Sequence, residues 1–254
     1  MVDLIVFRVG DNKYAMDIEN VQRIIQASSL TVIPNSHEYI DGMISYEDKI
    51  IKVLNFRKLI GMNAYEDELH QLFKSLVTAH ADWVNSLEVS LKTGVEFTKT
   101  FDSHGCGLGE WIDSFTAYDD HVLEVLNVLV EYHKQLHTKG GEAYEMREKA
   151  PAKAVALFED EIFSIYKHTM GALETFIEEL DIVADSLQKF LIYDASGVIF
   201  AIKVDAIEDI AHVEEDEFIN AGNEHETNEF LELDGVLDIK GVLINVIKTI
   251  KLPK

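Results

Sequence analysis

Residues 62–188 repeat their apolar side chains every three or four positions, and this periodicity constrains the fold more than any other feature of the sequence. Such spacing places apolar groups on one face of an α-helix, so the segment predicts several amphipathic helices. It contains a single proline, Pro151, which either ends one helix or lies in the first turn of the next. Successive amphipathic helices bury their apolar faces by packing as an antiparallel bundle.

Glycines mark the expected helix ends within this block. The stretch 94–105 and the pair Gly140-Gly141 are predicted to interrupt the helices. Helical segments are expected at residues 69–87, 111–115, 121–137 and 157–187.

The two flanks, residues 1–61 and 189–254, predict short strands separated by polar turns. Strands are expected at residues 4–7, 14–16, 39–44, 50–56, 190–193 and 198–202, with a further pair within 235–247. After the first two strands of each flank comes an apolar-periodic segment, 18–25 or 204–211, and the spacing in 18–25 predicts a helix. A short helical turn is expected at 57–60, and the acidic stretches 214–217 and 223–228 predict a solvated loop.

The flanks resemble each other, because both run strand, turn, strand, periodic segment and final strand pair. This weak repeat predicts one β domain of two similar lobes with the helical bundle inserted between its halves. The expected boundaries are 1–61 for the first part of the β domain, 62–188 for the bundle and 189–254 for the second part.

Composition excludes several functions. The formal net charge is −24, so the chain offers no basic surface for nucleic acid or anionic lipid. No apolar run approaches the roughly 20 residues needed to span a bilayer, which excludes membrane insertion. The start, Met1-Val2-Asp3, lacks the features of a signal peptide, and a single cysteine fits a reducing compartment. These features predict a cytoplasmic location.

One thiol and three imidazoles in the helical block point to a metal site. Cys106 is the only cysteine, and His133 and His137 lie four residues apart, so a helix presents both rings on one face. His80 lies on another apolar helical stripe, where an unpaired imidazole would be costly. Together these four side chains would complete a tetrahedral shell around Zn²⁺.

Each of the four residues also has an ordinary interpretation. A histidine on an apolar face is commonly a hydrogen-bonded core residue, and a lone buried cysteine behaves as a small hydrophobic residue. Other histidines compete as ligands, namely His70, His104, His121 and His168. A shell of four protein ligands leaves no position for water, which disfavours a metal-dependent hydrolase. Because a zinc-bound cysteine is a thiolate, Cys106 is also a candidate oxidation site, and the zinc is either structural or sensory.

The motifs around these residues resemble the chemoreceptor zinc-binding (CZB) domain. The similarity covers about residues 62–188 and lies in the motifs His80-Ala81-Asp82-Trp83, Cys106-Gly107-Leu108-Gly109-Glu110-Trp111 and His133-x-x-x-His137. The resemblance implies a four-helix bundle that binds zinc through His80, Cys106, His133 and His137. Trp83, Trp111 and Gly109 are then expected to support the ligands by packing around them.

The flanks resemble CheW-like domains, which join chemoreceptors to the chemotaxis histidine kinase. The matching segments are Phe7-Arg8-Val9-Gly10, Tyr14-Ala15-Met16-Asp17-Ile18, Ile33-Pro34-Asn35 and Tyr39-Ile40-Asp41-Gly42-Met43-Ile44, with looser similarity in 198–210 and 235–247. The resemblance implies two small β-barrel lobes that meet in a binding groove. The family's Asn-Leu-Arg-Gly is replaced here by Ser45-Tyr46-Glu47-Asp48, so the charge is reversed at Glu47, and Glu47 and Asp48 are candidate partner-binding positions.

The resemblances imply an α+β multidomain protein, a CheW-like domain with an inserted antiparallel four-helix bundle. We expect a non-enzymatic, cytoplasmic chemotaxis adaptor that couples the chemoreceptor cytoplasmic tip to a histidine kinase and responds to zinc or oxidant. A second copy of the chain is a further candidate partner, because bundles with exposed apolar stripes often pair. The alternative is a structural or zinc-handling protein that has lost its chemotaxis partners, and a metalloenzyme is a third reading.

Overall fold

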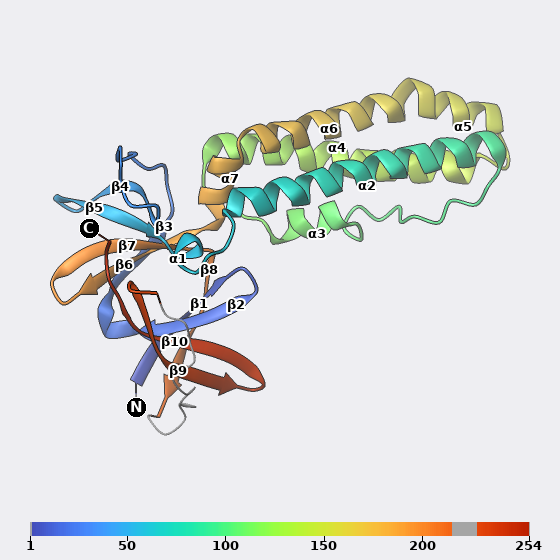
Figure 1. Cartoon of the computed structure of the whole chain (residues 1–254). Coiled ribbons are helices and arrows are strands. Elements are labelled where there is room, and N and C mark those ends of the chain that lie inside the picture. Colours follow the sequence, from blue (N-terminus) through green and yellow to red (C-terminus); the bar gives the residue numbers. More distant parts are fainter. Residues whose placement is uncertain (1, 215–227, 254) are drawn as a thin grey trace. The chain divides into compact units, whose positions relative to one another are not determined.

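The computed structural model describes residues 2–214 and 228–253, so most of the acidic stretch expected to form a loop lies outside the described residues. The chain divides into two compact units. A β unit combines Met1–Tyr65 with Asp185–Lys254, and a helical unit comprises Glu66–Ala184. The predicted fold class, α+β with a helical bundle inserted into a β domain, is confirmed (Figure 1).

The β unit contains two five-stranded sheets. Its strands are β1 (Val2–Val9), β2 (Asn12–Asp17), β3 (Val21–Gln26), β4 (Ile40–Tyr46), β5 (Lys49–Asn55), β6 (Lys189–Ala195), β7 (Val198–Val204), β8 (Ala206–Val213), β9 (Leu231–Ile239) and β10 (Val242–Ile250). A short helix, α1 (Phe56–Leu59), follows β5 at the place predicted for a helical turn.

Each sheet of the β unit combines strands from both sequence repeats. The first sheet has the order β8-β1-β2-β10-β9, and the second has the order β3-β6-β7-β5-β4. Strands β1–β5 form one repeat and β6–β10 the other, so each sheet takes two strands from one repeat and three from its counterpart. Parallel pairing joins the repeats, β2 with β10 and β5 with β7. Neither repeat can complete a sheet alone, and the β unit is therefore one folding unit.

The helix predicted at residues 18–25 is wrong. A single 3₁₀ turn, η1 (Ile18–Asn20), leads into β3, which pairs antiparallel with β6. A register shift between Val21 and Arg23 marks a bulge. The bulge breaks the strict alternation that would have identified a strand, and it leaves an apolar spacing that resembles a helix. The equivalent segment of the second repeat is strand β8.

Alternate residues of the strands face different cores. In β1, Leu4 and Val6 belong to a cluster within the first lobe, whereas Ile5 and Phe7 belong to a cluster shared with the second sheet. The second sheet has a cluster of its own, which includes Val53, Phe190 and Ala201. Each sheet thus curves around a separate core, and a third core joins the two lobes.

The described residues of the helical unit form three long helices and three short ones. They are α2 (Tyr65–Thr93), α3 (Gly107–Ser114), α4 (Asp120–Met146), α5 (Pro151–Leu157), α6 (Phe163–Glu178) and α7 (Leu180–Leu187), with a π-helical turn, η2 (Phe158–Ile162), between α5 and α6. Pro151 occupies the first turn of α5, where its missing N–H costs nothing.

The elements of this unit alternate in direction. Helices α2 and α4 run parallel, because His80 contacts His133 while Trp83, further along α2, contacts Gly140. Between them, residues 94–106 and α3 run back along α2, with Thr100 beside Trp83 and Trp111 beside Phe73. Helices α5 and α6 then return along α4 (Figure 1). The order is that of an up-and-down four-helix bundle whose second element is largely extended rather than helical.

The break predicted at Gly140-Gly141 is also wrong, because α4 continues through both residues to Met146. Gly140 is buried, and a Cβ atom at this position would overlap the ring of Trp83. The glycine therefore permits close approach of α2 and α4 and does not end the helix.

Candidate metal centre

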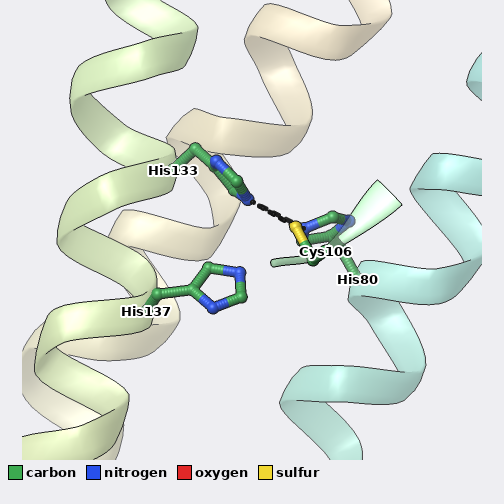
Figure 2. Close-up of side chains that lie close together, drawn as sticks. All are labelled: His80, Cys106, His133 and His137. Carbon is green, nitrogen blue, oxygen red and sulfur yellow. Dashed lines mark hydrogen bonds between the residues drawn. The ribbon is translucent and has the colours of Figure 1, made fainter. Parts of the chain in front are cut away.

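The four predicted residues converge inside the helical unit (Figure 2). His80 comes from α2, His133 and His137 come from α4, and Cys106 is the residue that caps the start of α3. One potential ligand atom from each lies within 4.8 Å of those of the others. The three imidazoles are at most 3% exposed, and the thiol is half-buried.

The distances among these atoms suit a small tetrahedral cation. His133 Nε2 lies 3.2 Å from His80 Nε2 and 3.2 Å from Cys106 Sγ. Cys106 Sγ lies 3.8 Å from His80 Nε2. Zn–N bonds of about 2.0–2.1 Å and Zn–S bonds of about 2.3 Å, spread tetrahedrally, separate the ligand atoms by roughly 3.3–3.6 Å. His80, Cys106 and His133 are thus spaced as zinc ligands without any large rearrangement, and a ring nitrogen of His137 lies within 4.8 Å of their ligand atoms.

One backbone carbonyl determines the tautomer of His80. The Nδ1 atom of His80 donates a hydrogen bond of 2.9 Å to the Leu76 carbonyl oxygen. Because a carbonyl can only accept, Nδ1 carries the proton and Nε2 keeps its lone pair directed into the cluster. Metal-binding histidines in proteins are commonly oriented in this way.

Burial keeps the cluster histidines neutral. It lowers the pKa of His133 to about 3, with further repulsion from His137 and His80. Burial and His80 lower the pKa of His137 to about 4, and burial also lowers the pKa of His80. Neutral imidazole is the form that binds metals. The ring nitrogens of His137 are buried and lack hydrogen-bond partners, a cost that coordination would remove.

The thiol is held by the local structure at the start of α3. Cys106 Sγ accepts a hydrogen bond from the Gly109 amide at 3.4 Å. A Cβ atom on Gly109 would overlap the Ser103 carbonyl, so only glycine allows α3 to begin so close to the preceding loop. Burial raises the pKa of the Cys106 thiol, while the Gly109 and Leu108 amides oppose this shift. A bound cation would favour the thiolate strongly.

The rival histidines lie in other surroundings. His104 contacts Asp113 at 2.9 Å, His121 contacts Glu179 at 2.8 Å, and His168 stacks on Tyr132. His70 is partly buried on α2. Within residues 2–214 and 228–253, the cluster of His80, Cys106, His133 and His137 is the only group of potential ligands close enough to share one ion.

The supporting residues occupy different places. Trp83 packs on His137 with ring centroids 4.9 Å apart, whereas Trp111 packs on Phe73. Glu47 and Asp48 lie in the exposed turn between β4 and β5. Sequence reasoning did not find the hydrogen bond from Trp83 Nε1 to the Thr100 carbonyl, because backbone acceptors leave no signal in side-chain patterns.

Comparison with protein families agrees with these observations. Residues 3–84 match the CheW-like domain, and residues 80–144 match the chemoreceptor zinc-binding domain. The chain therefore contains a CheW-like domain followed by a chemoreceptor zinc-binding domain, as its motifs predicted. Among the described residues, none of the helices combines the length and apolar character needed to cross a membrane.

Individual relatives cover parts of the chain. It is similar to the chemotaxis protein CheW of Thermotoga maritima, with 27% identity over 77 residues, covering 30% of this chain and 48% of the relative. It is also similar to the chemotaxis protein CheW of Rhizobium meliloti, with 31% identity over 64 residues, covering 25% and 41%. The chain thus spans about half the length, or less, of these curated relatives.

A solved structure, that of the scaffolding protein TtCheW from Thermoanaerobacter tengcongensis, aligns over 97% of this chain and 88% of that chain. The TM-score is 0.47 and the sequence identity 12%.

Proposed function

We propose that the protein is a cytoplasmic, non-enzymatic chemotaxis adaptor with a zinc-binding regulatory unit. The β unit binds a chemoreceptor cytoplasmic tip and the chemotaxis histidine kinase. The helical unit binds Zn²⁺ through His80, Cys106, His133 and His137. The observation that carries the metal assignment is His137, whose two buried ring nitrogens lack partners beside two other neutral imidazoles and a thiol.

The chemistry of the ligand set supports regulation by zinc or oxidant. Zinc supplies the positive charge that keeps Cys106 as a thiolate. A two-electron oxidant converts such a thiolate to sulfenic acid, and this removes a soft ligand from the shell. His80, His133 and His137 belong to two packed helices, so they remain close together when the sulfur no longer binds.

Capture experiments with purified partners test the adaptor function. The full chain, zinc-loaded or treated with chelator, is mixed with a chemoreceptor cytoplasmic fragment and with the kinase's regulatory domain. We expect binding of both partners, with an affinity that differs between the zinc-loaded and zinc-free forms. Absence of binding to either partner in both forms would exclude the adaptor function.

A second candidate is a zinc-handling or structural protein whose β unit no longer binds chemotaxis partners. The exposed Glu47, at the position where the family resemblance places an arginine, favours it. The substitution Glu47→Arg separates the two candidates. If the wild type captures neither receptor nor kinase and Glu47→Arg captures one of them, the second candidate is correct. If the wild type already binds, the first is correct.

A further inference from the structure

Solvent reaches only one of the four candidate zinc ligands to an appreciable extent. His80, His133 and His137 are 3%, 2% and 1% exposed, so the helices that carry them close the site on their side. Cys106 is the one member of the cluster that is partly exposed. A cation that arrives from solution therefore meets the cluster first at the thiol.

The chain on either side of Cys106 is exposed. Its two neighbours, Gly105 and Gly107, face solvent, and so does His104. The loop nevertheless has a defined shape, because the His104 amide donates to the Asp102 carboxylate at 3.0 Å and the Gly105 amide donates to the Asp102 carbonyl at 3.2 Å. A metal site closed on its other sides needs an entry path, and these residues lie along it.

His104 is a metal-binding type of side chain that the cluster does not use. Its Nδ1 atom lies 3.0 Å and 2.9 Å from the two carboxylate oxygens of Asp113. Because a carboxylate accepts hydrogen bonds, the neutral imidazole carries its proton on Nδ1, and Nε2 keeps a lone pair for a metal. The side chains of His104 and Asp113 are 69% and 50% exposed, so this pair lies in solvent and outside the cluster.

Gly109 brings His104 and Cys106 to the same place. A Cβ atom on Gly109 would lie 2.9 Å from the Cα atom of His104, so the loop backbone rests directly on this glycine. The Gly109 amide also donates to Cys106 Sγ at 3.4 Å. Asp113, one turn further along α3, then holds the imidazole of His104 beside the start of the helix.

The charges of this segment favour the arrival of a cation. Residues 99–113 contain three carboxylates, Asp102, Glu110 and Asp113, against one lysine, Lys99. All three carboxylates are exposed. Surface charges of one sign raise the local concentration of the opposite ion and its rate of association.

We propose that His104 is a transfer ligand, which binds Zn²⁺ as it arrives from solution and passes it to Cys106. This inference rests on the zinc binding proposed above and adds a residue outside the final ligand set. On transfer the bond from His104 to the cation breaks, the bond from Cys106 forms, and the thiol proton passes to water. His104 is free again once the cluster is filled, so it speeds the exchange of zinc without changing how tightly zinc is held.

The signature of a transfer ligand is a change in rates without a change in affinity. A group that binds only during entry and exit lowers a barrier that both directions cross. In His104→Ala we expect the rate constants for zinc uptake and release to fall together by about tenfold, with a dissociation constant within about twofold of the wild type. Stopped-flow mixing of the zinc-free full chain with Zn²⁺ and a fluorescent zinc indicator measures uptake. Mixing the zinc-loaded chain with excess chelator measures release.

His168→Ala is the matched control. His168 is also exposed, but it stacks on Tyr132 and contacts the Ser164 carbonyl, so its removal should leave both rate constants unchanged. Added salt separates the two effects of the segment, because it screens the attraction by exposed carboxylates and not a direct bond. The ratio of uptake rates between the wild type and His104→Ala should therefore persist at high salt.

The possible results distinguish this inference from the proposed function. If the wild type binds no zinc, the proposed function fails and this inference with it. If the wild type binds zinc and His104→Ala has unchanged rate constants, only the inference is overturned. Faster release with weaker binding in His104→Ala would also overturn it, because His104 would then contribute to the bound state. Equal slowing in His168→Ala would do the same.

Discussion

At the scale of single residues, Cys106 is the ligand whose removal is most informative. Cys106→Ala deletes the one sulfur of the cluster and leaves three imidazoles. We expect zinc affinity to fall by more than the roughly 10–100-fold that an outer-shell loss causes, and the helical unit to melt at lower temperature. Metal analysis and thermal melting measure both effects.

His104→Ala is the control for this prediction. His104 is two residues from Cys106 but is exposed and paired with Asp113, so its removal should leave the zinc content unchanged. Normal zinc content in Cys106→Ala, or loss of zinc in His104→Ala, would show that the ligand assignment is wrong.

The neutral histidines also predict the pH dependence of the zinc-free protein. Burial depresses the folded-state pKa values of His133 and His137 to about 3 and about 4, below the usual 6.5. Their contribution to stability is therefore complete above pH 6.5 and is lost as pH falls toward those values, because the unfolded chain binds protons first. Chelator-treated protein should melt at progressively lower temperature from pH 6.5 to 5.

A histidine variant isolates this effect from the titration of carboxylates. In His133→Gln one of the depressed groups is absent, so the decline in melting temperature between pH 6.5 and 5 should be smaller than in the wild type. An equal decline in both proteins would contradict the prediction. Measurements at pH 8 provide the reference, since the imidazoles of His133 and His137 are neutral there in both states.

The side-chain ligands of the site could be predicted from the sequence, whereas the backbone groups that hold them could not. His133 and His137 were found because their spacing of four residues puts them on one helical face. His80 and Cys106 were proposed as ligands from their chemistry and from the apolar stripe around His80, and the family resemblance implied the same set. Nothing in their separation along the chain fixes a contact. The carbonyls of Leu76 and Thr100 were missed, because any residue type can present a backbone oxygen.

At the scale of secondary structure, Gly140 tests whether helix packing or helix propensity dominates. Alanine is intrinsically better than glycine in a helix by about 1 kcal/mol. At position 140, however, the added Cβ overlaps Trp83, so Gly140→Ala should destabilise the helical unit by about 1–3 kcal/mol. Denaturant unfolding monitored by helical signal measures the change.

Gly171→Ala in α6 is the matched control, for which we expect the opposite effect on stability. A Cβ there meets no atom within 4 Å, and the site is exposed. We therefore expect stabilisation of roughly 0.5–1 kcal/mol from propensity alone. Destabilisation at position 171, or stabilisation at position 140, would refute the explanation of why α4 continues through its glycine pair.

Sequence patterns located most elements but misjudged those that tertiary contacts define. The helices around His80 and His133 and the hairpin strands were predictable from local periodicity. Residues 18–25 were misassigned because a bulge in β3 disrupts the alternation of apolar and polar residues. Gly140 was misinterpreted as a helix end because its role, to leave room for Trp83 of another helix, cannot be read from the local sequence. The sequence indicated a break between helices near residues 94–106 but did not show that this segment is extended.

At the scale of the whole molecule, the exchange of strands explains how the β domain tolerates a large insertion. The repeat was detectable from its order of strands and turns. The pairing of β3 with β6, or of β2 with β10, was not predictable, because either repeat could equally pair with itself. Because the sheets contain strands from before and after the helical unit, the two segments that connect this unit to the β unit must both be held in place within the β unit.

A buried ion pair provides this fixation. Arg57, directly after β5, and Asp205, between β7 and β8, are each about 1% exposed and form three hydrogen bonds of 2.6–3.0 Å. Arg57 also donates to the Asn63 carbonyl on the outgoing connection, while Gln188 on the returning connection donates to Asp205. Residues at both ends of the insertion thus hydrogen-bond to the same Arg57–Asp205 ion pair. Nothing in the sequence distinguished Arg57 or Asp205 from surface charges.

The final prediction concerns this pair. Asp205→Asn removes the charge but keeps the shape, and it takes from the buried Arg57 guanidinium the carboxylate that accepts three of its hydrogen bonds. We expect the β unit to lose about 3–5 kcal/mol of stability, the usual cost of breaking a buried pair from one side. Glu208→Gln, which removes a partner from the more exposed Arg8 and Lys13, should cost about 1 kcal/mol or less.

Denaturant unfolding of the zinc-loaded chain measures both variants, and amide exchange adds a local readout. Gly10 donates its amide hydrogen to Asp205 at 2.7 Å, so exchange at Gly10 should accelerate in Asp205→Asn and not in Glu208→Gln. Similar stability losses in the two variants would mean that the buried pair does not hold the connections. A selective loss in Asp205→Asn means that this buried pair within the β unit holds the two ends of the insertion in place.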